Sequence, residues 1–293
     1  MGGRGGSRVI DPSSVDWSTA RRASYRLRQA FRYEYQEPIT DLNHRLVMIP
    51  PARFGDQRRT YHDLLVELKE IRMQNREDRF GNVVIDVFAP EVQEAIEFVA
   101  EASVERWAAE PNIIAGGWPA AGYLLEVTPL TTADDRIQSA AARLAARAEW
   151  GLELADKIND WVYRSMTYRY GVTGIRTSAA EALAFGAGVC QDYAHVMLAL
   201  CRECRLPARY VSGHMLGQGG THAWVEVVLP AGGGHDAVAH AFDPTHAGRA
   251  GLGYVTIAVG RDYADVAPTS GTYRSGGTGR LTASKQVTLT DLG

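Results

Sequence analysis

The chain has only three cysteines in 293 residues, and this scarcity excludes a disulfide-stapled secreted scaffold. It has no uninterrupted apolar run of about 18 residues, so no transmembrane helix is expected. The first residues, MGGRGGSRVIDPSS, contain no apolar stretch of the kind that a secretory signal peptide carries. Together these absences predict a cytoplasmic protein that keeps its thiols reduced and makes no contact with a membrane.

The sequence also lacks an excess of either charge. The formal net charge is -3, and the clustered Arg21, Arg22, Arg26 and Arg28 alternate with apolar residues, as on the wet face of a strand. Nucleic-acid binding is therefore not expected. The contents of apolar residues (45%) and charged residues (22%) are ordinary globular values and predict a sizeable packed core. Nothing in the composition decides whether the chain forms a homo-oligomer.

The first third of the chain has the alternating pattern of β-strands. Residues 1–20 are rich in Gly and Ser and predict no regular element. The segments YRLRQAFRYEY, LNHRLVMIPP and VVIDVFAP read as strands, with the turn-rich NREDRFGN before the last of them. AIEFVAEASVERW fits either a strand or a helix. We therefore expect a β-rich domain over residues 21–110.

The middle of the chain changes to helical spacing. PNIIAGGWPAAG is a connection rich in Gly and Pro. The following DDRIQSAAARLAARAEWGLELADKINDWVYRSM is rich in Ala, Leu, Arg and Glu, with apolar residues at helical intervals. Residues 111–165 are therefore expected to form a connection and one or two bridging helices.

Residues 166–293 mix helices with strands. A capping box, S-x-x-E, at Ser178 predicts a short helix that two glycines end. A second helix begins at Cys190 and ends before Pro207. The segments ARYVSGHML, HAWVEVVLP, VAHAFDP and YVTIAV predict an antiparallel meander, and TASKQVTLTDL alternates again. The predicted fold class is α+β.

Cys190 stands where the glycine-rich FGAG segment meets a helix. A thiol becomes a good nucleophile when its pKa falls, and the unpaired N–H groups and dipole of a helix N-terminus favour the thiolate. The backbone N–H of Cys190 is also suited to bind an oxyanion. The alternative interpretation is a small buried residue at a helix start, which is the commoner role of a lone cysteine.

His222 and Asp243 are the base and the orienting acid that a thiol nucleophile needs. They fall in THAWVEV and AFDPT, on sequential predicted strands, and sequential strands tend to pair. Such pairing would place the two side chains beside each other over the helix N-terminus. Each residue taken singly is more commonly structural. The order and spacing of all three favour a catalytic role for Cys190, His222 and Asp243.

Other polar residues near the thiol are weaker candidates. Asp192 is expected to stabilise the helix N-terminus, with substrate binding as the alternative. Gln191 is either an oxyanion donor or a cap that faces solvent. His195 lies on the helix face away from the thiol. His214 is a rival base, but no acid follows it in register.

Cys201 and Cys204 lie three residues apart on the same predicted helix. No second cysteine pair or convincing histidine pair completes a zinc site with them. Both are expected to pack in the core or at an interface. We therefore expect neither a metal nor another cofactor.

Two aromatic residues are candidates for the substrate cleft. Trp224 lies two residues after His222, on the same strand face, where it either shields the imidazole or packs in the core. Tyr168 precedes the capped helix and is expected to line the cleft.

Three segments together resemble the transglutaminase-like cysteine peptidase family: GVCQDYAHVMLALCRECRLPARYVSG, THAWVEVVLP and FDPTH. The run IAVGRDYADVAP and the turn DRFGN extend the resemblance to the bacterial branch, over about residues 22–290. This resemblance implies a papain-like α+β core, with a nucleophile helix packed on an antiparallel sheet, over residues 166–293. It also implies Cys190 as nucleophile, His222 as base and Asp243 as orienting acid, with no metal required.

The implied reaction is acyl transfer through a thiol on a peptide, protein or amide substrate, and hydrolysis is the preferred outcome. Protein cross-linking by amine transfer and a non-catalytic peptide-binding scaffold remain as alternatives. The chain departs from the family pattern at His246, where Asn is common, and at Tyr254, where His is frequent. Both positions adjoin the acid, so Tyr254 is expected to line the substrate pocket.

Overall fold

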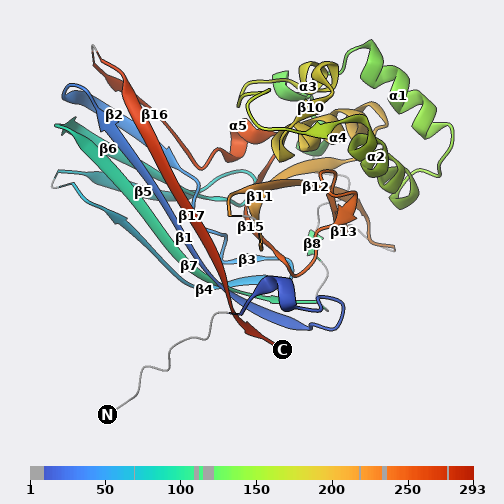
Figure 1. The fold of residues 1–293 in the computed structure, drawn as a ribbon, viewed down its shortest axis with the longest axis horizontal. Helices are drawn as coiled ribbons and strands as arrows, with labels where there is room; N and C mark the ends of the chain where they lie inside the picture. Colours follow the sequence, from blue (N-terminus) through green and yellow to red (C-terminus); the bar gives the residue numbers. More distant parts are fainter. Residues whose placement is uncertain are drawn as a thin grey trace.

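The computed structural model describes residues 10–68, 70–108, 112–114, 122–217, 219–232, 236–275 and 277–293. Two lobes are visible, one made of long strands and one in which helices cover a shorter sheet (Figure 1). We call them the N-terminal lobe and the core lobe. The predicted α+β class with a mainly β front is confirmed. Most of the connection PNIIAGGWPAAG lies outside the described residues.

The N-terminal lobe consists of two antiparallel sheets. The five-stranded sheet has the order β17-β1-β7-β4-β3, with bounds Gly279–Leu292, Arg22–Tyr35, Ala95–Trp107, Gln57–Val66 and Arg53–Phe54. The four-stranded sheet has the order β16-β2-β6-β5, with bounds Thr269–Arg274, Ile39–Leu46, Val83–Val92 and Arg72–Glu77. Alternating apolar residues, among them Phe31, Leu42 and Phe98, form a core between these sheets. The ambiguous segment AIEFVAEASVERW forms β7.

The core lobe contains a six-stranded sheet. Five strands follow the order β14-β13-β12-β11-β15, with bounds Gly248–Arg249, Ala237–Asp243, His222–Pro230, Ala208–Met215 and Tyr254–Gly260, and β8 (Asn112–Ile114) pairs with β13. The predicted meander holds for β11, β12 and β13. It fails for β15, which crosses to the opposite edge and pairs with β11. A repeating turn pattern identifies strands but does not fix the edge to which the last one returns.

The helices cover one face of the core sheet (Figure 1). They are α1 (Asp135–Ala145), α2 (Leu152–Ser165), α3 (Ala179–Phe185), α4 (Cys190–Glu203) and the short α5 (Tyr263–Val266). Val225 and Phe242 face these helices, whereas Trp224 packs on the other face near Phe54 and Phe80 of the N-terminal lobe. Covered on both faces, β12 is buried along nearly all its length. No helix in the described ranges is long and apolar enough to cross a membrane.

The last two strands do not belong to the core lobe, where the interval 166–293 placed them. The chain leaves the core after α5 and adds β16 to β2 and β17 to β1. In Figure 1, β17 therefore runs beside β1, although the two strands come from opposite ends of the sequence. Alternation predicts the strand TASKQVTLTDL but carries no information about its partner.

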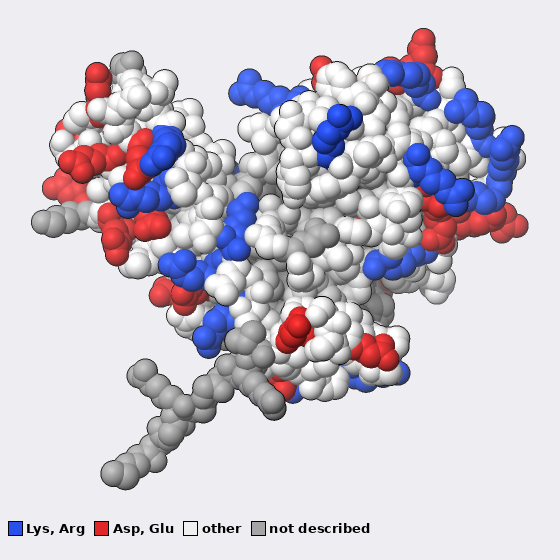
Figure 2. All heavy atoms as spheres, viewed as in Figure 1, with Lys and Arg blue, Asp and Glu red and all other residues white. Residues whose placement is uncertain are grey.

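Charged side chains of both signs are interspersed on the face shown in Figure 2. They gather over the strands of the N-terminal lobe and over the helices, and the centre of this face carries few of them. Neither sign forms a continuous field on it.

Two buried side-chain amides of the N-terminal lobe cap the free edge of β15. Gln57 Nε2 donates to the Thr256 carbonyl at 2.8 Å, and the Thr256 N–H donates to Gln57 Oε1 at 2.9 Å. Asn82 makes the same pair of bonds with Val259, at 2.7 and 2.8 Å. Each amide replaces a residue of a neighbouring strand, so this sheet edge is satisfied without another strand.

The turn DRFGN fixes the position of one of these amides, that of Asn82. Asp78 Oδ1 accepts the backbone N–H groups of Phe80 and Asn82, at 2.9 and 3.0 Å, and Asp78 Oδ2 accepts the Asn82 amide at 3.0 Å. Gly81 has φ +84°, a conformation that disfavours side chains. The side chain of Asn82 is thereby fixed before it meets β15, which accounts for the order D-x-x-G-N.

We predict that Asn82→Ala destabilises the protein by roughly 3 kcal/mol, because it leaves the buried N–H and carbonyl of Val259 unpaired. Asn75→Ala is the matched control, because Asn75 is exposed on β5 and its loss should cost less than about 0.5 kcal/mol. Urea unfolding of both variants measures the difference. Equal stabilities for the two variants would show that the amide does not hold the lobes together.

Candidate functional site

The loop before α4 places Cys190 at the first position of that helix. Asp192 folds back, and its Oδ2 accepts the N–H of Val189 at 2.7 Å and the hydroxyl of Thr173 at 2.6 Å. A Cβ on Gly188 would lie 2.5 Å from the same oxygen, so the loop needs glycine there. The predicted role of Asp192 at the helix N-terminus is confirmed.

β12 and β13 are sequential and paired, with Val225 opposite Phe242. This register brings His222 and Asp243 together, and His222 Nε2 lies 2.8 Å from Asp243 Oδ2. The imidazole also lies close enough to Cys190 for the thiol to raise its pKa. Because Nε2 faces the carboxylate, Nδ1 is the nitrogen left for the thiol. The structure therefore brings all three predicted residues together, with His222 hydrogen-bonded to Asp243 and adjacent to Cys190.

Burial and charge act in opposite directions on the imidazole. Its burial disfavours the protonated form, yet the hydrogen bond to Asp243, the nearby thiol of Cys190 and the charges of both groups raise the pKa of His222 to about 9. Burial likewise disfavours the Asp243 carboxylate, but donors from His222 and His246 hold its pKa well below the usual value. Asp243 is therefore a carboxylate, and His222 is prepared to carry a proton.

Asp243 is completely buried and accepts hydrogen bonds through both oxygens. The N–H of Thr245 donates to Oδ1 at 2.9 Å. Besides His222, the phenol of Tyr254 and Nδ1 of His246 lie 2.8 Å from Oδ2. Both residues were recognised only as departures from the family pattern. The hydroxyl of Tyr254 is directed at the acid, and the expected contact of this residue with substrate remains a prediction.

The ring of Trp224 packs beside the imidazole of His222. Its ring stacks near His222, with centroids 6.4 Å apart and planes inclined by 24°, and it meets Tyr254 edge-on at 5.4 Å. Only 2% of Trp224 is exposed. Both interpretations of this residue therefore hold, since it packs in the core and also covers one side of His222. A substrate contact by Trp224 remains a prediction.

Tyr168 lies beside the loop that precedes Cys190, because β9 (Thr167–Tyr168) runs parallel to β10 (Ala187–Gly188). It is close enough to Cys190 for the thiol to act on its phenol electrostatically. A cavity of about 550 Å³ opens here, lined by Tyr163, Met166, Thr167, Tyr168, Tyr193, Thr245 and His246. The position of Tyr168 agrees with a role in the cleft. Gln191 is half-buried at the second position of α4, and its role as a donor remains a prediction.

His195, His214, Cys201 and Cys204 take no part in the group formed by Cys190, His222 and Asp243. Nε2 of buried His195 accepts the N–H of Tyr263 at 3.2 Å, and Nδ1 of buried His214 faces the Gly220 carbonyl at 3.1 Å. Cys201 is fully buried in the core cluster, and Cys204 packs against it. All three cysteines are free thiols.

Lys285 is a residue of the site that sequence reasoning missed. It lies on β17, and its ammonium donates to the hydroxyl of Thr221, next to His222, at 3.3 Å. Burial lowers the pKa of Lys285, while attraction to Cys190 opposes that change. The last strand of the chain thus places a positive charge near the thiol. No local motif marks this residue, because its position follows from strand pairing alone.

His222, Asp243 and His246 are the described residues that could together hold a metal ion, since their ligand atoms lie within 4.8 Å of one another. These atoms are already joined by hydrogen bonds through Asp243 Oδ2. A metal would therefore compete with the arrangement described above. The absence of a metal requirement remains a prediction.

Two family models match this chain. The model described as transglutaminase-like superfamily matches residues 138–235, which include Cys190 and His222. The model described as bacterial transglutaminase-like N-terminal region matches residues 25–105, which include the turn DRFGN. The chain therefore belongs to the transglutaminase-like superfamily and carries the N-terminal region of its bacterial branch.

Similar proteins extend over nearly the whole chain. Uncharacterized protein ML0607 of Mycobacterium leprae is 27% identical over 281 residues, covering 87% of this chain and 95% of that protein. Uncharacterized protein Rv2569c of Mycobacterium tuberculosis is 27% identical over 286 residues, covering 88% and 90%. A crystal structure described as "a Putative Cysteine Protease from Cytophaga hutchinsonii" aligns with a TM-score of 0.74 at 23% identity, over 93% and 92% of the two chains. The two chains share the transglutaminase-like fold.

We predict that His222 makes the stability of the protein depend on pH. Its pKa is about 9 in the folded protein against an ordinary 6.5, so the folded state binds the proton more tightly. The resulting stabilisation is complete below pH 6.5 and is lost as the pH rises through about 9. His222→Gln should remove this loss, which is on the order of 3 kcal/mol.

Urea unfolding of the parent and of His222→Gln across this pH range measures the effect. His62→Gln is the control, because His62 is exposed on β4 and its removal should leave the loss of stability at high pH in place. Parallel profiles for the parent and His222→Gln would contradict a raised pKa for His222.

Proposed function

We propose that the protein is a thiol-dependent acyl-transfer enzyme that hydrolyses peptide or carboxamide bonds through Cys190, His222 and Asp243. The observation that carries this proposal is the hydrogen-bonded pair of Asp243 and His222 beside a half-buried thiol at a helix N-terminus. A thiol nucleophile needs an adjacent base that a third group orients, whereas a cysteine with only a structural role needs neither.

In the first half-reaction, the Cys190 sulfur attacks the carbonyl carbon of the substrate, and His222 holds the thiol proton. The negative charge that develops on the carbonyl oxygen is stabilised by the backbone N–H of Cys190 at the start of α4, with Gln191 as a candidate second donor. The imidazolium then gives its proton to the leaving amine as the C–N bond breaks. A thioester on Cys190 and a free amine or ammonia are formed.

In the second half-reaction, neutral His222 takes a proton from water, and the resulting hydroxide attacks the thioester carbonyl. The C–S bond breaks, the sulfur regains its proton from the imidazolium, and a carboxylic acid leaves. Asp243 remains a carboxylate throughout and orients the imidazole. If a primary amine replaces the water, the same step gives a new amide, which is the amine-transfer alternative.

The cavity beside Tyr168 supports a substrate with an uncharged side chain. Three tyrosines and Met166 form much of its wall, and none of the described residues that line it is Asp, Glu, Lys or Arg. The volume of about 550 Å³ is sufficient for a large apolar or aromatic group. We therefore propose peptides or protein segments whose acyl residue is apolar or aromatic as the first substrates to test.

The test is hydrolysis of a panel of N-acyl dipeptide amides with Phe, Leu, Gln, Glu or Lys as the acyl residue. We predict that Phe and Leu substrates are cleaved fastest, and that Cys190→Ala lowers the rate at least about 10³-fold. Product amine and ammonia are measured by mass spectrometry and by coupled assay. Cys204→Ser is the matched control, because Cys204 lies at the other end of α4 and should retain the parent rate.

The alternatives give different results in the same assay. Added primary amine recovered in an amide product would favour amine transfer over hydrolysis. If Cys190→Ala retained the parent rate, the nucleophile assignment would be wrong. The scaffold alternative predicts no turnover of any substrate and slow alkylation of Cys190, like that of an ordinary half-buried thiol.

A further inference from the structure

The loop that carries Tyr254 into the site is held almost entirely by other parts of the chain. All four carbonyl groups of residues 251–254 accept hydrogen bonds. Nη1 of Arg106 donates to the first at 2.6 Å and to the last at 2.5 Å. The hydroxyl of Tyr25 donates to the second, and the N–H of Leu216 donates to the third at 2.9 Å. Three of these four bonds come from the N-terminal lobe.

Arg106 is itself fixed in one orientation. Its Nη2 and Nε face both oxygens of Asp56, at 2.7 to 3.3 Å, which is the bidentate geometry of a strong guanidinium–carboxylate pair. Only 14% of the Arg106 side chain and 13% of the Asp56 side chain are exposed. The N–H of Trp107 also donates to the Asp56 carbonyl at 3.2 Å. With Nη2 and Nε occupied, Nη1 points at the loop.

The loop connects this ion pair to the acid of the thiol site. The Tyr254 phenol donates to Asp243 Oδ2 at 2.8 Å, the same oxygen that faces His222. The ring of Tyr254 packs edge-on against Trp224, so a shift of its backbone would move the hydroxyl relative to the carboxylate. A continuous series of contacts thus runs from Asp56 through Arg106, the loop and Asp243 to His222.

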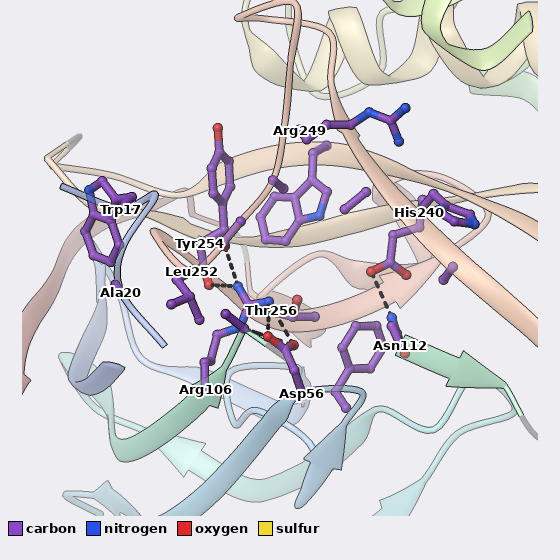
Figure 3. A pocket seen from close by; sticks show the side chains of 18 of the residues that line it. Trp17, Ala20, Asp56, Arg106, Asn112, His240, Arg249, Leu252, Tyr254 and Thr256 are labelled. Atoms are coloured by element: carbon purple, nitrogen blue, oxygen red, sulfur yellow. Dashed lines mark hydrogen bonds and ion pairs between the residues drawn. The ribbon is translucent and has the colours of Figure 1, made fainter. Parts of the chain in front are cut away.

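Figure 3 shows this arrangement from the side of a cavity of about 560 Å³ between the two lobes. Asp56 and Arg106 lie at its base, and dashed lines join them to each other and to the loop that bears Tyr254. The ring of Tyr254 extends from the loop past this cavity. The ion pair borders this cavity, and the two hydrogen bonds of Arg106 fix the loop beside it.

We propose that Arg106 is a positioning residue of the thiol site. It fixes residues 251–254 so that the Tyr254 hydroxyl holds Asp243 in the orientation that His222 requires. The N-terminal lobe thereby completes the site without supplying a group that touches substrate. The relevance to catalysis rests on the proposed function, but the effect on the thiol and imidazole does not.

The experiment measures the rate of alkylation of Cys190 by iodoacetamide against pH in the full-length protein, with the labelled peptide quantified by mass spectrometry. Tyr254→Phe and Arg106→Met should each lower the rate near neutral pH by about tenfold, the worth of one hydrogen bond to a charged group. Both substitutions should also shift the pH dependence of the Cys190 alkylation rate in the same direction. Because Arg106 acts through the Tyr254 hydroxyl, the double variant should react at the rate of Tyr254→Phe alone.

Asn82→Ala is the matched control, because it removes another contact between the N-terminal lobe and β15 but leaves the Tyr254 loop intact. It should lower the stability and leave the alkylation profile within about twofold of the parent. If Arg106→Met fails to fold, Asp56→Asn loosens the guanidinium while keeping it in place and is tested for the same non-additivity with Tyr254→Phe.

Two outcomes overturn the proposal. One is that the effects of Arg106→Met, or of Asp56→Asn, and Tyr254→Phe multiply in the double variant. The other is that Asn82→Ala slows alkylation as much as Arg106→Met does. Neither depends on turnover. If the protein hydrolyses no substrate but shows the non-additive pattern, the positioning role of Arg106 stands and the proposed function is wrong. If it hydrolyses substrate but the effects multiply, the proposed function stands and the positioning role is wrong.

Discussion

The structure depends on keeping one carboxylate ionised where water does not reach it. Asp243 is fully buried, and a buried charge is costly unless donors surround it. Four donors do so, from the backbone of Thr245 and the side chains of His222, His246 and Tyr254. Each donor must in turn be held in place. The pairing of β12 with β13, the crossing of β15 to the far edge and the docking of the N-terminal lobe all serve that need.

Most of the helices and strands, and the grouping of Cys190, His222 and Asp243, could be predicted from the sequence because those features are encoded locally. Helical spacing and a capping box mark the helices, and Cys190, His222 and Asp243 each stand at the start or end of a recognisable element. The resemblance to a known family added the roles. Tyr254 and His246 were noticed only as departures, since nothing adjacent to them indicates that their polar atoms turn toward Asp243.

The features that could not be predicted are those decided by distant pairing. Arg106 and Lys285 reach the site from β7 and β17, and neither belongs to a motif. The same limit explains why residues 269–292 were assigned to the core lobe: alternation identifies a strand but not its neighbour. The turn DRFGN is an intermediate case. Its pattern was recognisable, but its purpose became clear only when Asn82 was found on the edge of β15.

The pairing of β17 with β1 also governs the order in which the protein can be completed. β1 is synthesised long before β17, so one edge of the five-stranded sheet stays open until β17 has been made. Such a long sequence separation makes closure of the sheet a late event in folding. Lys285 arrives beside the thiol only with that closure. A chain that has not yet added β17 therefore carries Cys190 without the positive charge that Lys285 places near it.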